Sequence, residues 1–131
     1  MEEQKEAIQN IGPGSVGLIG IPFDDHSSYL RGAAKAPKKI REAFAHPSSN
    51  TSTENITDLL HEPKFVDLGD LEIDNYIKDI ENAATDIIDR GGRVLALGGD
   101  HSITYPLIKA HSKKFDHINI MQLDAHPDLY N

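Results

Sequence analysis

Hydrophobic residues occur in short runs separated by longer segments with helical periodicity. The runs at 15–22 (SVGLIGIP) and 93–97 (RVLAL) are apolar at consecutive positions, on both faces of an extended chain. That pattern is typical of buried strands in a parallel sheet. The runs at 64–68 (KFVDL) and 118–123 (INIMQL) predict two further strands, which gives four in all.

Between these runs, apolar residues recur at the spacing of one helix face. Pro37 lies near the start of the first such segment, where proline is tolerated. Gly91 and Gly92 end the second segment, and Ser102 can cap the third. The pattern predicts helices over 33–44, 73–90 and 103–114.

Strands that alternate with helices indicate an α/β fold with a mainly parallel sheet. The chain has 131 residues, the usual size of one domain, and no linker divides it. Residues 46–58 (HPSSNTSTENITD) are rich in Ser, Thr and Asn and predict an exposed loop. In a parallel sheet, ligands bind beyond the carboxyl ends of the strands.

Composition narrows the classes of function. The formal net charge of −8 disfavours nucleic acid as a partner and is compatible with a cationic substrate. No apolar run approaches the roughly 20 residues that cross a bilayer, and the charged N-terminus lacks a secretion signal. The chain contains no cysteine, which suits a cytoplasmic protein, and any metal must be held by imidazole and carboxylate.

The fourth predicted strand leads into Asp124, His126 and Asp128. Side chains alternate along an extended chain, so these three point the same way if extension persists past the strand. Such a trio is costly to bury without a compensating cation. Carboxylate and imidazole without thiolate suit manganese, and zinc remains an alternative.

The third predicted strand leads into Gly98-Gly99-Asp100-His101-Ser102. The glycines allow a tight turn, from which His101 can face the same site while Asp100 orients a ligand. Either cluster alone could be a solvated loop or a capped turn. Because both follow consecutive strands, together they favour a metal site.

The two clusters also resemble the paired signatures of the ureohydrolases: arginase, agmatinase, formimidoylglutamase and guanidino-acid hydrolases. The residues that carry this likeness are 97–102 (LGGDHS) and 124–128 (DAHPD). An N-terminal pattern is similar to that of the agmatinase branch, and it comprises 20–24 (GIPFD), 31–33 (RGA), Pro37 and 40–41 (IR).

The resemblance implies the three-layer, parallel-sheet fold of the arginase type, of which this chain is the N-terminal half. It also implies two Mn²⁺ ions per complete site. His101 and Asp128 would bind one ion, His126 the other, and Asp124 would bridge both. Metal-activated water would attack the guanidinium carbon, with His126 and Asp128 as catalytic residues.

The implied reaction releases urea and an amine from a small guanidinium substrate. Agmatine is expected first, giving putrescine for polyamine biosynthesis. Arginases typically carry an asparagine where this chain has Tyr130, although Tyr130 could simply line the mouth of the site. His26 could touch substrate or be a surface residue. Surface or structural roles are expected for the histidines outside the motifs: His46, His61, His111 and His117.

The family's other two metal-binding aspartates, its proton-shuttling histidine and its substrate-reading loop lie on later segments than those given. We therefore expect the chain to be a fragment of a longer enzyme that does not turn over substrate efficiently alone. Relatives commonly form homo-oligomers, so a homo-oligomer is also expected. Alternatives are a noncatalytic metal-binding paralogue, another ureohydrolase, a zinc deacetylase and, least favoured, a nucleotide-binding domain.

Overall fold

The computed structural model describes residues 6–126. Its sheet has three parallel strands in the order β2-β1-β3. Their bounds are Val16–Gly20 for β1, Phe65–Asp70 for β2 and Arg93–Leu97 for β3. All three strands lie where the hydrophobic pattern predicts them. Because β1 is central, its residues from 17 to 20 are all buried.

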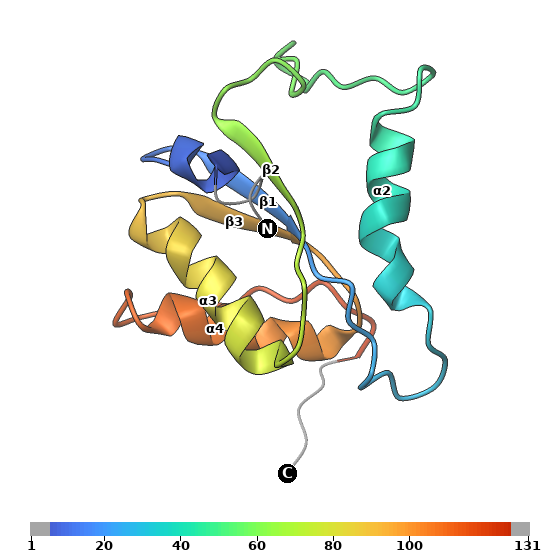
Figure 1. Ribbon diagram of the computed structural model, residues 1–131, viewed down its shortest axis with the longest axis vertical. Helices are drawn as coiled ribbons and strands as arrows, with labels where there is room; N and C mark the ends of the chain where they lie inside the picture. Colours follow the sequence, from blue (N-terminus) through green and yellow to red (C-terminus); the bar gives the residue numbers. More distant parts are fainter. Residues whose placement is uncertain (1–5, 127–131) are drawn as a thin grey trace.

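Helices cover both faces of this sheet. Figure 1 shows α3 (Tyr76–Asp89) and α4 (Thr104–Ser112) packed together on one side and α2 (Ala36–Phe44) on the other. Short 3₁₀ turns occur at η1 (Ile8–Asn10), η2 (Ala33–Lys35) and η3 (His101–Ile103). The arrangement confirms the three-layer, parallel α/β fold.

The ends of α3 follow directly from its sequence. The Asn75 side chain accepts a hydrogen bond from the backbone N–H of Lys78 at 3.1 Å, which satisfies a free donor of the first turn. At the other end, Gly91 adopts a φ of 84°, the left-handed conformation that commonly terminates helices. The predicted end of this helix at the glycine pair is therefore confirmed.

The core lies between the sheet and α3. Isoleucines from β1 and the residue after it, Ile19 and Ile21, pack with Ile80 and Ile87 of α3, and all four are at most 1% exposed. At about 2 kcal/mol for each buried large aliphatic side chain, this cluster is a major contribution to stability. It holds the carboxyl ends of β1 and β3 in fixed relation to each other.

One predicted element is absent from the described chain, because residues 118–123 do not form a strand. Ile120 is 64% exposed, Met121 85% and Leu123 93%. A strand of a parallel sheet needs a hydrogen-bonded neighbour and cover on both faces. Within residues 6–126, β3 pairs only with β1, so the expectation of four strands is wrong for this part of the chain.

Candidate functional site

The turn after β3 is held against the chain that follows β1. Ile21 donates its backbone N–H to Leu97 at 2.8 Å, and Asp100 donates its backbone N–H to Phe23 at 2.9 Å. Gly99 is required here, because a Cβ at this position would lie 2.0 Å from the Phe23 carbonyl oxygen. The predicted tight turn with close backbone approach is therefore present, and it fixes the position of His101.

Asp100, rather than Ser102, caps the helical segment that follows. Its Oδ1 accepts hydrogen bonds from the backbone N–H of Ser102 at 3.0 Å and from the Ser102 hydroxyl. The prediction of Ser102 as the cap is wrong by two residues. The physical reason is that the 3₁₀ turn begins at His101, so the residue before it supplies the capping oxygen.

His101 is exposed, and its Nδ1 lies 3.2 Å from the Thr104 hydroxyl. Thr104 is one helical turn further along the chain, a spacing at which side chains meet. Sequence reasoning missed this contact, although the interval of three residues was the available signal. Thr104 thus restrains the imidazole, the kind of contact expected of a ligand-orienting partner.

The second motif lies near the first but is not extended. The chain bends at residues 124–126, because the Asp124 carboxylate accepts the backbone N–H of His126 at 3.1 Å. The His126 Nδ1 lies 3.9 Å from the same carboxylate oxygen. Side-chain alternation therefore does not continue from Asp124 to His126 as expected. Asp128 and Tyr130 lie outside the described residues.

Asp124 is near enough to His101 to interact with it electrostatically. The pKa of Asp124 is held below its ordinary value, mainly by the hydrogen bond from the His126 backbone and also by the charge of His101. This interaction links the two motifs. Among residues 6–126, no three His, Cys, Asp or Glu side chains converge into a metal-binding group.

A cavity of about 400 Å³ opens beside His101. The loop after β1 forms its other wall, so His26 belongs to this cavity even though its side chain is exposed. The lining consists of His26, Ser27, Ser28, Tyr29, Leu30, Ala33, Asp100, His101 and Ser102.

The histidines outside the motifs have local partners or lie on the surface. His61 pairs with Asp58, and His46 contacts Ser48. The His111 Nδ1 lies 2.8 Å from the Leu107 carbonyl oxygen within α4. His117 is exposed. These surroundings agree with the surface or structural roles expected of them.

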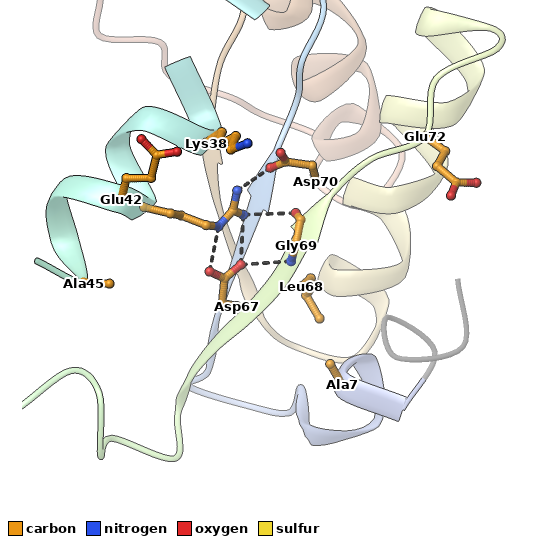
Figure 2. A pocket seen from close by; sticks show the side chains of 10 residues that line it. Ala7, Lys38, Glu42, Ala45, Asp67, Leu68, Gly69, Asp70 and Glu72 are labelled. Carbon is orange, nitrogen blue, oxygen red and sulfur yellow. Dashed lines mark hydrogen bonds and ion pairs between the residues drawn. The ribbon is translucent and has the colours of Figure 1, made fainter. Parts of the chain in front are cut away.

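A second cavity, of about 790 Å³, lies between α2 and β2 (Figure 2). Arg41 crosses it, donating to both carboxylate oxygens of Asp67 at 2.7 and 2.9 Å, to the Gly69 carbonyl at 3.0 Å, and to Asp70. Figure 2 labels the three acceptors, Asp67, Gly69 and Asp70, and marks these bonds as dashed lines. Its donors are thus committed to joining α2 to the sheet, and this cavity is structural.

Within the described residues, no helix combines the length and apolar character needed to span a bilayer.

Comparison with known proteins gives one consistent family. The model of the arginase family matches residues 14–131. Arginase 1, mitochondrial, of Oryza sativa subsp. indica is 39% identical over 129 residues, covering 89% of this chain. Agmatinase of Blochmanniella floridana is 32% identical over 124 residues, covering 87%. This chain spans 38% and 40% of those two relatives, respectively.

Solved structures give the same result. The arginase from Medicago truncatula aligns with a TM-score of 0.83 and 32% identity, over 98% of this chain and 46% of that one. The agmatine ureohydrolase of Thermoplasma volcanium aligns with a TM-score of 0.64 and 33% identity, over 74% and 34%. Fold, motifs and comparisons thus agree that this chain belongs to the arginase family.

Proposed function

We propose that this chain supplies the first metal-ligating residues of a ureohydrolase that converts a small guanidinium substrate to urea and an amine. The observation that carries the proposal is the pair of motifs, 97–102 (LGGDHS) and 124–128 (DAHPD), inside a match of the arginase family model over residues 14–131. Membership of the arginase family supports the reaction class. Because the chain spans about two fifths of its relatives, the activity is proposed for the complete site.

The donor set fits manganese in kind but is incomplete in the described residues. Imidazole and carboxylate are ligands that Mn²⁺ accepts, and the arginase family is generally manganese-dependent. In the complete site, His101 and Asp128 would hold one ion, His126 would hold the second, and Asp124 would serve both. When bound, such ions lower the pKa of coordinated water toward neutrality. His126 and Asp128 are the proposed catalytic residues.

Two substrates each have a specific observation in their favour. Tyr130, in place of the asparagine typical of arginases, favours agmatine, which lacks the α-carboxylate. Similarity favours arginine, because the matched plant arginase is 39% identical and the matched agmatinase 32%. The products would be putrescine or ornithine, respectively, with urea in both cases.

The test is urea release with added Mn²⁺, with agmatine and arginine supplied separately. We expect little urea from the 131-residue chain alone. Joined at Asn131 to the remaining C-terminal part of the Medicago truncatula arginase, the chain should release urea. Absence of urea from the joined, folded protein with either substrate would contradict the proposal. Substituting Asn for Tyr130 in the same protein should shift its preference toward arginine.

Ligand variants separate catalysis from simple metal binding. In the joined protein, we expect His101→Asn to lower urea release by more than about 100-fold, since even partners of metal ligands contribute 10- to 100-fold. His117→Asn changes an exposed histidine and is the matched control. If Mn²⁺ binds, as measured by electron paramagnetic resonance, and no urea forms, the noncatalytic alternative is the correct one.

We also propose a homo-oligomer located in the cytoplasm. The oligomer rests on the family, and the location rests on a sequence without cysteine. The similar arginase of Oryza sativa is named as a mitochondrial protein. Sedimentation of the purified protein and cell fractionation test these two proposals separately.

A further inference from the structure

The segment from Asp24 to Ala34, which we call the 24–34 loop, is closed at its base by one carboxylate. The Asp24 Oδ2 accepts the backbone N–H of Gly32 at 2.6 Å and that of Ala34 at 3.0 Å. These bonds hold the pKa of Asp24 below its ordinary value. Asp25 and Arg31 form an ion pair within the loop. These contacts within the loop therefore hold it as one preformed unit.

A second carboxylate fastens this unit to the His101 turn. The backbone N–H of His26 donates to the Asp100 Oδ2 at 2.9 Å, across 74 positions of sequence. The other Asp100 oxygen holds Ser102, as described above. The Asp100 side chain therefore bonds at the same time to the loop, at His26, and to Ser102 in the turn, so that it connects the two residues that flank His101.

Aromatic packing fixes the same end of the loop. The rings of Phe23 and Tyr76 are stacked, with centroids 4.7 Å apart and an angle of 7° between their planes. The His26 ring meets both edge-on, at 5.2 and 4.6 Å. Such arrangements stabilise a contact beyond the area that they bury. The loop is thus anchored at His26 by a hydrogen bond and two ring contacts.

Beyond this anchor, the loop is exposed beside the imidazole. Residues 27–30 line the cavity that His101 also lines. Tyr29 is 90% exposed and Leu30 72%, although both are large and apolar. The cavity thus offers serine hydroxyls, one carboxylate and an uncovered apolar tip. These groups suit a short aliphatic chain with a polar or cationic end.

We propose that Asp100 is a positioning residue, which holds the 24–34 loop against the His101 turn. Residues 27–30 then form the wall that binds the part of a guanidinium substrate remote from the reacting carbon. This inference rests on the proposed function for the identity of the ligand. Asp100 acts through the loop, since its carboxylate bonds to the His26 backbone and to Ser102.

The positioning role is tested by amide hydrogen exchange of the chain. Asp100→Asn keeps the shape of the side chain and removes its charge, which weakens acceptance from His26. We expect exchange at the His26 amide to rise by at least about fivefold, with α3 unchanged. Asp86→Asn, an exposed aspartate on α3, is the matched control. Unchanged exchange at His26 overturns the inference.

A second variant keeps the test decisive if Asp100→Asn does not fold. Ser102→Ala removes only the hydroxyl that donates to the Asp100 Oδ1. Exchange at the His26 amide should then rise by a smaller factor, because one of three bonds to the carboxylate is lost. No rise in this variant also overturns the proposal.

Ligand contact is tested by nuclear magnetic resonance titration of the joined protein with agmatine, with diamagnetic Mg²⁺ in place of Mn²⁺, because Mn²⁺ broadens the signals of nearby amides. Shifts at the amides of residues 27–30 support the wall. Shifts confined to other residues overturn this inference alone, whereas no shifts anywhere overturn it together with the proposed function. If Asp100→Asn leaves the loop ordered for only about a tenth of the time, the agmatine Kd rises about tenfold. Mn²⁺ affinity should change less than about twofold, and equal loss of both affinities contradicts a positioning role.

Discussion

The two sequence motifs that identify the family differ in how firmly the rest of the structure holds them. The Gly98–Ser102 turn is held by backbone bonds to Phe23, by the Asp100 carboxylate and by the helix that follows. The Asp124–His126 segment is exposed, and the hydrogen bonds that it makes, from Gln122 to the His126 carbonyl and from the His126 backbone to Asp124, join near neighbours in sequence. Both motifs are equally specific as sequences. A motif therefore acquires fixed geometry only where neighbouring strands supply partners.

The difference begins at the strands that precede each motif. β3 pairs with β1 at every residue from Arg93 to Leu97. The turn after β3 therefore begins at a fixed position. Residues 118–123 have no such partner within the described chain. Backbone N–H and C=O groups that are not paired in a sheet bind water instead. The side chains that follow such a segment are then not held in one common direction.

The largest effect should come from crowding the fixed turn. In Gly99→Ala, the new Cβ would lie 2.0 Å from the Phe23 carbonyl oxygen and 2.8 Å from that of Ile21. Since both neighbours are backbone, we expect a loss of about 3 kcal/mol in unfolding free energy. Urea denaturation measures it, with Gly12→Ala as the control, because nothing lies within 4 Å of that position. Equal stability of the two variants would mean that the turn is not closely packed.

A smaller loss of unfolding free energy is expected when the contact between α2 and the sheet is broken. Arg41→Gln leaves Asp67 and Asp70 without their guanidinium partner, at a site where the Arg41 side chain is only 23% exposed. We expect a loss of about 2 kcal/mol, since hydrogen bonds to charged groups contribute about that much. Lys39→Gln breaks a much more exposed pair with Glu42 and should cost less than about 1 kcal/mol. A reversed order of the two variants would contradict this account.

The α3–α4 contact that supports the His101 turn should depend on pH. Lys109 and Lys113 hold the pKa of Glu81 below its ordinary value of 4.5. The ionised carboxylate therefore stabilises the fold above about pH 4.5, and this stabilisation is lost as the pH falls through the lowered folded value. Tm measured from about pH 6 to pH 3 should fall less in Glu81→Gln than in the unmodified protein. Glu72→Gln, at an exposed position, should follow the unmodified protein.

The smallest change in unfolding free energy is expected in the exposed segment at residues 118–123. Met121→Ser and Leu123→Ser replace side chains that are 85% and 93% exposed. Each should change the unfolding free energy by less than about 0.5 kcal/mol. Leu68→Ser, at a position 6% exposed, should cost several times more and serves as the comparison. A loss above about 1 kcal/mol at Met121 or Leu123 would mean that 118–123 packs as a strand in solution.

Local sequence determined most of the framework. Apolar runs placed β1, β2 and β3 to within two residues, and Gly91 marked the end of α3. These features depend on burial and on backbone conformation at single positions, which the sequence expresses directly. The paired motifs also identified the family, because ligand types and spacing are readable without coordinates.

Tertiary structure decided what depends on distant partners. Asp100 reaches His26 across 74 positions, and Arg41 reaches Asp67 across 26, contacts that no periodicity predicts. The same dependence explains the missing fourth strand, since 118–123 has the right composition but no neighbour to pair with in residues 6–126. Sequence by itself thus set the chemistry of the donors, while strand pairing and long-range hydrogen bonds decided which donors have a fixed place.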